Sequence, residues 1–433
     1  MDTLFRKSNP ADTSGVSDKN YQQPLPDMLT EKYHSTRLLT ERIVSGMCAE
    51  DMQLQSMPDA SPVKWHLAHT TWFFETFILN RLNGYKPFHE HFNVLFNSYY
   101  NSVGEQFKRP DRGVLSRPTV KEILTYRSHV DDTMRKYLAD EISDEEQSII
   151  MLGIHHEQQH QELIFTDIKH AFSQNPLFPG LIQRQYDDGP SQILKFVSFE
   201  GGLYELGTNA ANIEFCFDNE TPKHPVHVSP FKLASRPVTN SEYAEFITDG
   251  GYEDPLLWLS DGWALTKGLG QMCPVYWKKQ DGEWFEFTLA GLQPTQADAP
   301  VCHVNYFEAC AFAAWAGKRL PTEFEWEVAA MGLPIEGNFL DMNVLHPRSA
   351  RNSGLTQLFG DVWEWTSSAY SPYPGYKPVR GALGEYNGKF MCGQYVLRGG
   401  SCVTPPGHIR STYRNFFYPH SFWQFSGIRL AID

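Results

Sequence analysis

Two histidines four positions apart are the strongest chemical signal in the sequence. They lie in the run His155-His156-Glu157-Gln158-Gln159-His160-Gln161-Glu162. Periodic apolar residues predict a helix over residues 144–172, and a spacing of four places His156 and His160 on the same face of that helix. Two imidazoles one helical turn apart can bind one divalent metal ion.

A third ligand is expected from the helix predicted over residues 63–82, which contains the run WHLAHTTWFFETF. Within it, His69 lies on an apolar stripe with Trp65 and Trp72. A buried imidazole without a partner costs free energy, and helix bundles commonly build metal sites from facing helices. His66 lies off the centre of the stripe and is the second choice. The sequence therefore predicts a metal site formed by His69, His156 and His160.

These ligands do not select the metal, because imidazole binds zinc, copper, iron and nickel alike. The segment from His156 to His160 also matches the HExxH pattern of zinc proteases, in which Glu157 would be the general base. Hydrogen-bonded histidines without any metal are the remaining interpretation. The combination of a histidine pair on one helix with a histidine on another favours metal binding over that interpretation. Three neutral ligands would leave positions open for substrates and oxygen.

Four amphipathic segments surround these residues and predict a four-helix bundle. They span residues 24–49, 63–82, 119–138 and 144–172. The connection between the second and third segments, residues 83–118, is long enough to suggest a functional role.

A second domain is predicted after a stretch rich in proline, glycine and polar residues, 173–195, which is interpreted as a linker. Beyond it, short apolar runs alternate with turn residues, and only 239–248 and 305–331 have a helical pattern. We therefore expect an α+β protein of two domains. They would cover residues 23–172 and 196–433, after a disordered tail over residues 1–22.

Composition excludes several classes of function. The 433 residues carry a formal net charge of −14, which argues against a broad nucleic-acid interface. No apolar run approaches the ~20 residues of a membrane span, and the N-terminus does not resemble a signal peptide. The 7 cysteines are scattered and form no CxxC pair, so a reduced, cytoplasmic protein is expected. The sequence carries no indication of oligomeric state.

The two halves of the chain resemble two known families. The N-terminal half is similar to DinB-like metal-binding bundles, with LAH ending at His69 and the HxxxHxE pattern of His156, His160 and Glu162. The C-terminal half resembles the formylglycine-generating-enzyme fold. The motifs that carry this resemblance are GG at 201–202, RLPTEFEWE at 319–327, GDVWEW at 360–365, RGGS at 398–401 and GIRL at 427–430. Their combination is characteristic of the sulfoxide synthases of ergothioneine and ovothiol biosynthesis.

This resemblance implies a non-haem Fe(II)- and O2-dependent enzyme. It would join the imidazole C2 of hercynine (N-α-trimethylated histidine) to a thiol, cysteine or γ-glutamylcysteine, as a sulfoxide. The alternatives are an ovothiol-type synthase acting on histidine and cysteine, a selenium-transferring relative, and a zinc-dependent DinB-like thiol transferase. One departure concerns Cys402, which is the single cysteine near RGGS, where a formylglycine-generating enzyme has a metal-binding pair. The second domain is therefore expected to form a wall of the substrate site.

Candidate substrate residues lie in the long connection and between the metal ligands. Tyr99 and Tyr100 are candidates for donating a proton or an electron during oxygen reduction, with Tyr100 favoured. Gln159 could hydrogen-bond the substrate imidazole. Arg109 and Arg112 could hold the carboxylate of the thiol, since guanidinium groups bind carboxylates bidentately. Packing of the tyrosines and simple surface exposure of the arginines are the alternative interpretations.

The run 413–421, YRNFFYPHS, resembles the family's trimethylammonium-binding segment, through Asn415 and Phe416. Members that use γ-glutamylcysteine carry an aspartate after this aromatic residue and an arginine four residues later. Here those positions hold Phe417 and Ser421, so free cysteine is the expected thiol. The family's other tyrosine pair is placed only loosely at 373 and 376, in a loop rich in proline and glycine, and is assigned no role.

Overall fold

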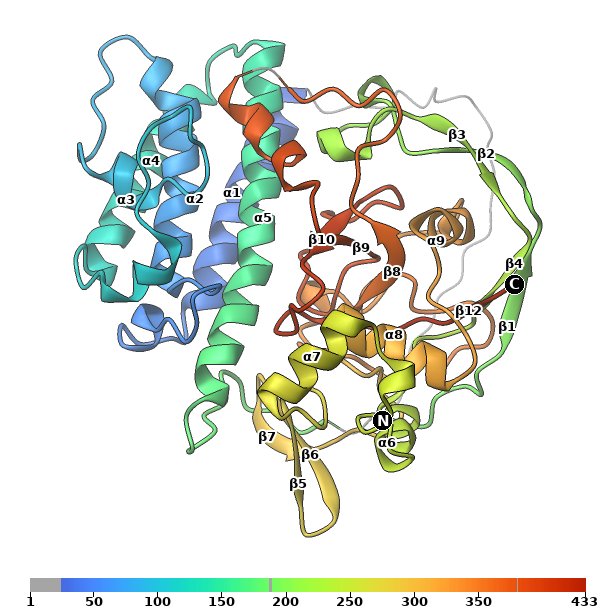
Figure 1. Cartoon of the computed structure of the whole chain (residues 1–433). Coiled ribbons are helices and arrows are strands. Elements are labelled where there is room, and N and C mark those ends of the chain that lie inside the picture. Colours follow the sequence, from blue (N-terminus) through green and yellow to red (C-terminus); the bar gives the residue numbers. More distant parts are fainter. Residues whose placement is uncertain (1–24, 187–188, 380) are drawn as a thin grey trace, which may run out of the picture.

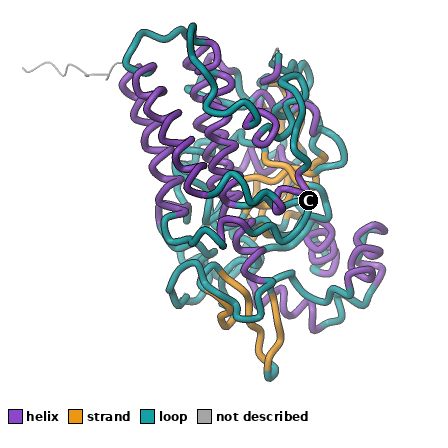
Figure 2. The backbone as a smooth tube through the Cα atoms, turned by 90° about the vertical axis from the view of Figure 1, so that its left-hand side faces the viewer, coloured by secondary structure: helices purple, strands orange, loops and turns teal. Residues whose placement is uncertain are grey.

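The computed structural model describes residues 25–186, 189–379 and 381–433; the predicted tail, 1–22, lies outside them. A bundle of long helices stands beside a domain of short strands and helices (Figure 1), and the view at right angles shows the helices of the bundle running side by side (Figure 2). The predicted α+β fold with two domains is confirmed.

The four predicted bundle helices are all present, with short α3 in the connection between the second and third. Their bounds are α1 (Leu25–Val44), α2 (Val63–Phe77), α3 (Phe92–Phe96), α4 (Val120–Tyr137) and α5 (Asp144–Ser173). Sequence-local caps begin two of them. Thr119 and Glu122 form a capping box at α4, and Ser143 and Glu146 form one at α5.

Helix α2 is the buried centre of the bundle. Every residue of this helix except Thr76 is buried, which is why its sequence is apolar or aromatic around most of its circumference. Helix α5 lies at the boundary with the second domain, where it faces β8, β9 and β10 (Figure 1). The two helices that carry the predicted metal ligands therefore occupy the core and the inner face of the bundle.

The second domain contains four small sheets in the described part of the chain. Their strand orders are β1-β4-β12, β10-β9-β8-β11, β2-β3 and β5-β6-β7. The strands are β1 (Phe196–Phe199), β2 (Gly202–Leu206), β3 (His224–Val228), β4 (Phe231–Ala234), β5 (Trp277–Gln280), β6 (Glu283–Thr288), β7 (Gly291–Pro294), β8 (Trp363–Ala369), β9 (Tyr395–Arg398), β10 (Asn415–Phe417), β11 (Ser426–Gly427) and β12 (Ala431–Ile432). All pairs are antiparallel except β8 with β11, which are parallel.

Four α-helices accompany these sheets in the described part of the second domain. Three of them, α6 (Asn240–Thr248), α8 (Tyr306–Trp315) and α9 (Glu323–Ala330), fall in the two segments with a helical pattern. The fourth, α7 (Ser260–Leu269), was not predicted, because two glycines lower its helix propensity. Gly262 is required by packing, since a Cβ atom there would lie 2.5 Å from Cβ of Phe307. Tertiary contact with α8 therefore stabilises a helix that its own sequence only weakly favours.

The stretch interpreted as a linker lies against the second domain. The backbone amides of Leu181 and Ile182 donate to the carbonyl of Leu289, at 2.7 and 3.1 Å. Further along, the amide of Gln192 donates to the carbonyl of Ala350 at 2.6 Å. These backbone hydrogen bonds attach the described part of the stretch to the sheet domain.

A buried carboxylate joins the two domains. Glu162 of α5 accepts hydrogen bonds from Trp363 Nε1 at 2.7 Å, Ser401 Oγ at 2.8 Å and Thr404 Oγ1 at 2.6 Å. Burial raises the pKa of Glu162, while these three donors oppose that rise. The GDVWEW and RGGS motifs thus bind the helix that carries His156 and His160.

Two further observations bear on the class of protein. No helix in the described residues has both the length and the apolar character that a membrane span requires. All seven cysteines are free thiols.

Candidate metal centre

Three histidines from two helices converge in the interior of the bundle. His69 of α2 and His156 and His160 of α5 each offer one ring nitrogen, and these three atoms lie within 4.8 Å of one another. The Nε2 atoms of His69 and His156 are 3.1 Å apart. The structure therefore brings together the three residues that the sequence singles out, in a geometry that one ion could occupy.

The tautomer of His69 follows from its backbone partner. Its Nδ1 lies 2.5 Å from the carbonyl oxygen of Phe96, which can only accept a hydrogen bond, so Nδ1 carries the proton. In neutral His69, Nε2 then has no proton and carries a lone pair, which points at His156. The ring itself is stacked against Trp65, at 4.6 Å between centroids and 14° between planes. This packing holds the lone pair in place.

The tautomer of His160 is set by His66, which was the second choice for the third metal ligand. Nε2 of His66 lies 3.0 Å from the Asp167 carboxylate, and Nδ1 of His66 lies 2.7 Å from Nδ1 of His160. The carboxylate accepts, so His66 donates through Nε2 and accepts through Nδ1 from His160. Because Nδ1 of His160 carries the proton, Nε2 of His160 has a lone pair that is free to bind a metal ion. His66 therefore orients a candidate metal ligand, His160, and such partners are common around metal-bound histidines.

Burial keeps all three imidazoles neutral. It lowers the pKa of His69 and His160 well below the usual histidine value and that of His156 to about 3. Neighbouring histidines lower the pKa of His69 and His160 further. Neutral imidazoles whose lone pairs converge in a buried space fit a divalent metal ion, because a cation relieves the repulsion between the lone pairs.

The zinc-protease interpretation does not fit this geometry, because Glu157 points away from the histidines. Its carboxylate accepts from Arg37 Nη1 at 2.7 Å, Arg127 Nη2 at 2.6 Å and Thr40 Oγ1 at 2.6 Å. Two guanidinium groups hold the pKa of Glu157 at about 2, against the opposing effect of its burial. A carboxylate ionised and fully engaged in this way is not available as a general base.

The second domain closes the space beside the histidines. The hydroxyl of Tyr386 donates to Gln159 Oε1, and its ring lies 5.7 Å from that of His156. Gln159 Nε2 donates to the hydroxyl oxygen of Tyr413 at 2.7 Å. Sequence reasoning missed Tyr386 and Tyr413. The position of Tyr413, as the first residue of the run 413–421, is the one signal that could have indicated its role.

The two tyrosines of the long connection join the same aromatic cluster. Tyr99 and Tyr100 stack at 4.7 Å, and the ring of Tyr99 lies 6.2 Å from that of Tyr386. Tyr100 is fully buried, with its ring 5.7 Å from Trp72, which in turn stacks on His69 at 5.6 Å. Burial raises the pKa of both hydroxyls well above the usual tyrosine value, so both remain protonated at neutral pH.

The two candidate arginines are placed differently. Arg109 is exposed and donates to the backbone carbonyl of Asp59. Arg112 is buried, and its guanidinium lies 3.4 Å from the centroid of the Trp65 ring that stacks on His69. It donates to the Oγ atoms of Ser61 at 2.9 Å and Ser98 at 3.4 Å. The structure therefore brings Arg112, and not Arg109, next to the metal centre.

Arg112 has an incomplete set of partners. Within the described residues its printed side-chain partners are the two serine hydroxyls and no carboxylate, and its Nε has no hydrogen-bond partner. Burial, together with the neighbouring positive charge of Arg109, lowers the pKa of Arg112 to about 9. The Asp167 carboxylate opposes this decrease without contacting the guanidinium. A buried guanidinium in contact with no carboxylate is costly, and an anionic ligand would reduce that cost.

The remaining candidates lie on and around β10. Asn415 and Phe416 are half-buried, and Phe416 stacks on Tyr370 at 4.1 Å. Phe417 packs edge-on against Trp423.

The loosely placed tyrosine pair is engaged elsewhere. Tyr373 donates to Glu323 at 3.3 Å, and Tyr376 donates to Asp218 at 2.8 Å. Neither contact involves α5. Tyr386, which follows this pair in the connection between β8 and β9, is the tyrosine that contacts α5, through Gln159.

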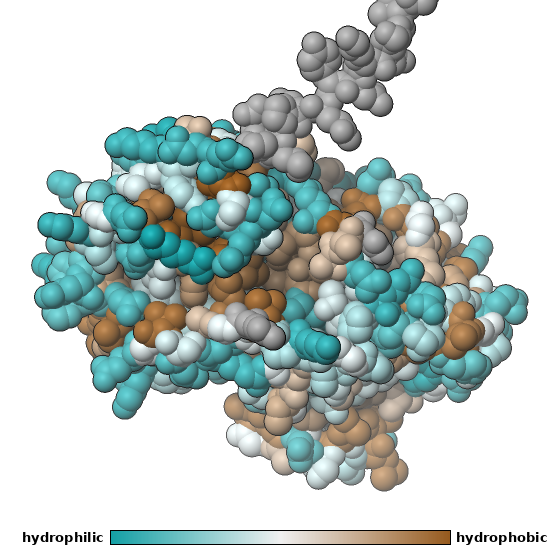
Figure 3. All heavy atoms as spheres, turned by 90° about the horizontal axis from the view of Figure 1, so that it is seen from above, coloured by the Kyte–Doolittle hydropathy of each residue, from teal (hydrophilic) through white to brown (hydrophobic). Residues whose placement is uncertain are grey.

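A groove leads toward this site from the boundary between the domains. Its volume is about 640 Å³, and its walls include Phe77 and Leu152 from the bundle and Phe217 and Tyr386 from the second domain. Figure 3, a view from above, shows apolar side chains gathered in the hollowed zone between the two parts. Because Tyr386 lines the groove and also binds Gln159, this groove borders the metal centre.

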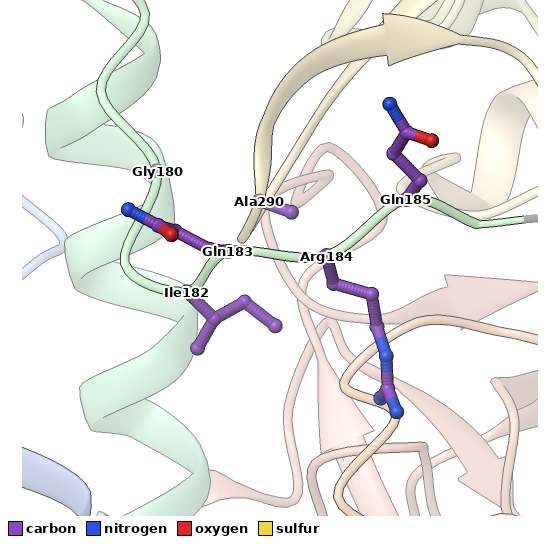
Figure 4. Close-up of a pocket in the computed structure, with 6 residues that line it drawn as sticks. All are labelled: Gly180, Ile182, Gln183, Arg184, Gln185 and Ala290. Atoms are coloured by element: carbon purple, nitrogen blue, oxygen red, sulfur yellow. The ribbon is translucent and has the colours of Figure 1, made fainter.

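A shallow hollow elsewhere has no such relation to the histidines. It is lined by Gly180, Ile182, Gln183, Arg184, Gln185 and Ala290 (Figure 4). Arg184 is the charged member of this set, and it donates to the backbone carbonyl of Asn343. We assign no chemistry to this hollow.

Comparison with known proteins decides the family. The model of the DinB superfamily matches residues 32–164, and the model of the sulfatase-modifying factor enzyme 1-like domain matches residues 183–352 and 334–433. Hercynine oxygenase of Mycolicibacterium smegmatis is 32% identical over 438 residues, which cover 94% of this chain and 99% of that protein. The chain belongs to the hercynine oxygenase family.

Other relatives agree with this assignment. Hercynine oxygenase of Mycobacterium tuberculosis is 32% identical over 434 residues, covering 94% of this chain and 99% of that protein. Formylglycine-generating enzyme of the same organism is 29% identical over 238 residues, which cover only 43% of this chain and 78% of that enzyme. The predicted family is thus confirmed, and this member of the hercynine oxygenase family is an oxygen-dependent oxidoreductase.

The contact between His66 and His160 leads to a prediction about metal affinity. Replacing His66 by Phe leaves the Nδ1–H of His160 without an acceptor and frees the ring to rotate. We expect the affinity for Fe(II) to fall by about 10–100-fold, the usual effect of removing such a partner. Anaerobic titration of the apoprotein with Fe(II) measures it. His129→Phe, on the exposed side of α4, is the control, and equal affinities in both variants would contradict the role of His66.

Proposed function

We propose that this chain is an Fe(II)- and O2-dependent sulfoxide synthase that joins C2 of the hercynine imidazole to L-cysteine. The observation that carries the proposal is the convergence of His69, His156 and His160 in one space bordered by Gln159 and Tyr386. A metal ion held by these histidines would lie beside an amide suited to an imidazole and beside a hydroxyl group, at the boundary of the two domains. The names of the hercynine oxygenases of M. smegmatis and M. tuberculosis support hercynine as the substrate.

The overall reaction balances with oxygen as the oxidant. The C2–H bond of the imidazole and the S–H bond of the thiol are broken, and a C–S bond forms. One atom of O2 ends in the sulfoxide and the other in water, whose two protons come from the broken bonds. Iron held by the three histidines would supply oxygen activation and a coordination position for the thiolate.

Protein side chains would orient the two organic substrates. Gln159 would hydrogen-bond the hercynine imidazole, and Asn415 with Phe416 would contact its trimethylammonium group, since aromatic faces attract quaternary ammonium ions. Arg112 would bind the carboxylate of cysteine, which supplies the counterion that its guanidinium lacks. Arg109 would contribute only long-range positive charge, because its guanidinium is engaged on the surface.

The buried tyrosines would handle protons. Tyr99 and Tyr100 keep their hydroxyl protons at neutral pH, because burial raises the pKa of both well above the usual value. Either hydroxyl could donate a proton during the reduction of oxygen, and transfer by a positioned group speeds such steps by roughly 10²–10⁴-fold. Tyr386 is the additional candidate, because its ring lies 5.7 Å from that of His156.

Anaerobic reconstitution tests the proposal on the full chain. The apoprotein is loaded with Fe(II), mixed with hercynine and cysteine, exposed to air, and the products are identified by mass spectrometry. We expect hercynylcysteine sulfoxide and consumption of O2. Histidine in place of hercynine tests the ovothiol-type reaction, and selenium donors test the selenium-transferring alternative. Product formation with Zn(II) in the absence of O2 would instead identify a thiol transferase.

The choice of thiol is a separate prediction. In γ-glutamylcysteine the cysteine amine is an uncharged amide, and the γ-glutamyl group carries an ammonium and a carboxylate of its own. Burying either of these charges without a partner costs several kcal/mol. Phe417 packs against Trp423 and Ser421 is buried, so neither position offers a charge. We expect kcat/KM for cysteine to exceed that for γ-glutamylcysteine at least about tenfold, which corresponds to about 1.4 kcal/mol in transition-state binding.

Competition between the two thiols measures this preference directly. Equal concentrations are supplied with limiting hercynine, and the two sulfoxides are quantified by mass spectrometry. The double variant Phe417→Asp, Ser421→Arg restores both charges and is expected to shift the product ratio toward γ-glutamylcysteine. A wild-type ratio of one, or one favouring γ-glutamylcysteine, would show that other residues bind the γ-glutamyl group.

A further inference from the structure

A chain of hydrogen bonds runs from the second domain to Gln159. It begins at the backbone carbonyl of Pro406, which accepts from Nε2 of Gln158 at 3.4 Å. Gln158 Oε1 lies 3.1 Å from Nδ1 of His408, and His408 Nε2 lies 3.0 Å from the hydroxyl of Tyr413. That hydroxyl accepts from Nε2 of Gln159 at 2.7 Å. This chain of hydrogen bonds thus leaves α5 at Gln158, passes through the second domain, and ends on α5 at Gln159.

The direction of every bond in this chain is determined by its first member. A carbonyl oxygen can only accept, so Gln158 donates through Nε2 and presents Oε1 to His408. His408 must then donate through Nδ1, which leaves its Nε2 as an acceptor for the Tyr413 hydroxyl. The oxygen of Tyr413 is left to accept from Gln159 Nε2. Nδ1 of His155 lies 3.1 Å from that of His408. Because Oε1 of Gln158 requires His408 to donate through Nδ1, this contact leaves the direction unchanged.

The amide of Gln159 therefore has one permitted orientation. Its Nε2 faces Tyr413, on the side of the second domain, and its Oε1 faces Tyr386, whose ring lies beside that of His156. The metal side of the amide is thus a hydrogen-bond acceptor. A flipped amide would present a donor there, and it would place Oε1 opposite an oxygen whose proton is already engaged with His408.

We propose that His408 and Tyr413 are positioning residues that fix the orientation of the Gln159 amide, so that the site selects a ring that donates an N–H. This assignment rests on the proposed function, because it takes hercynine as the ligand beside Gln159. A neutral imidazole bound to a metal through one nitrogen has an N–H on the other, and Gln159 Oε1 is the acceptor for it.

Burial makes the orientation depend on these two residues. His408 is 1% exposed and Tyr413 is 3% exposed, so water cannot readily replace either partner. The ring of Tyr413 packs against Trp363 and Phe217, at centroid distances of 5.5 and 5.6 Å. Tyr413→Phe keeps this packing and removes only the hydroxyl. The change leaves Gln159 Nε2 and His408 Nε2 without partners, and the amide becomes free to turn.

A double-mutant cycle on the full, Fe(II)-loaded chain tests this role without turnover. The dissociation constant of hercynine is measured anaerobically by calorimetry for wild type, Tyr413→Phe, Gln159→Leu and the double variant. We expect Tyr413→Phe to weaken binding about tenfold in the wild-type background and to have no further effect beside Gln159→Leu. His408→Phe should weaken binding in the same direction as Tyr413→Phe. Iron content stays at the wild-type level in each, and Tyr204→Phe, whose hydroxyl donates to the carbonyl of Glu200, is the matched control.

Two results would overturn the assignment. Wild-type affinity in Tyr413→Phe would mean that the hydroxyl does not orient Gln159. An equal loss in both backgrounds would mean that Tyr413 acts on hercynine independently of Gln159. A wild-type chain that binds no hercynine is a distinct outcome, which would overturn the proposed function and this assignment together.

Discussion

His156→Ala is expected to abolish sulfoxide formation, with a loss of at least about a thousandfold in kcat/KM, or about 4 kcal/mol. The variant removes one of three converging lone pairs and opens a cavity at the centre of the bundle. Two ligands bind iron more weakly than three and leave its open positions undefined, so both metal content and activity should fall. Iron analysis after anaerobic loading, followed by the sulfoxide assay, measures both quantities.

The control for this variant is His129→Ala, which removes an exposed imidazole from α4. It should retain full iron content and full activity. His69→Ala and His160→Ala should behave like His156→Ala, because the three nitrogens lie within 4.8 Å of one another. Full iron content and activity in any of these three variants would remove that histidine from the ligand set.

Tyr100→Phe is expected to lower sulfoxide formation by about a hundredfold and to divert oxygen toward cysteine sulfinate. The phenylalanine keeps the ring contacts with Trp72 and Phe77, so the loss reports on the hydroxyl alone. Without a proton donor, the positioned thiol becomes the site that oxygen attacks, and general acid catalysis accounts for roughly 10²–10⁴-fold in rate. The ratio of sulfoxide to sulfinate, measured by mass spectrometry, checks this expectation.

Three parallel variants determine which hydroxyl carries the role. Tyr99→Phe tests the stacked neighbour of Tyr100, Tyr386→Phe tests the hydroxyl that binds Gln159, and Tyr204→Phe is the surface control. If Tyr99→Phe and Tyr100→Phe both form sulfoxide at the normal rate and yield, the role assigned to the long connection is wrong. A diverted product in Tyr386→Phe alone would transfer that role to Tyr386.

The two-domain arrangement explains why a bundle with three histidines needs a partner domain. Glu162 accepts hydrogen bonds from the GDVWEW and RGGS motifs and from Thr404, which follows RGGS. Gln159 forms hydrogen bonds with Tyr386 and Tyr413, which lie in the loops after these two motifs. Motifs that the sequence links to the formylglycine-generating-enzyme fold here hold α5 and shape the space beside the metal centre. The second domain thereby borders the candidate metal centre, and its expected role as a wall of the substrate site stays a prediction.

The sequence by itself determined the four long helices of the bundle, and it predicted that His69, His156 and His160 would lie together. A spacing of four residues places His156 and His160 on one face of a helix, and the capping boxes at Thr119 and Ser143 mark where α4 and α5 begin. These signals are local, because helical periodicity and backbone capping depend on residues within a few positions of each other. The apolar stripe around His69 is a local signal of the same kind, and it predicted that this histidine faces the interior of the bundle from a second helix.

Only the tertiary structure decided which side chains meet across segments. It directs Glu157 to Arg37 and Arg127, and it makes His66 a hydrogen-bond partner of His160. It also brings Tyr386 and Tyr413 to Gln159, from positions 227 and 254 residues away. The loops that carry these tyrosines are rich in glycine and proline and have no periodic pattern. Their side chains are placed by packing against α5, a contact that no local property of the sequence encodes.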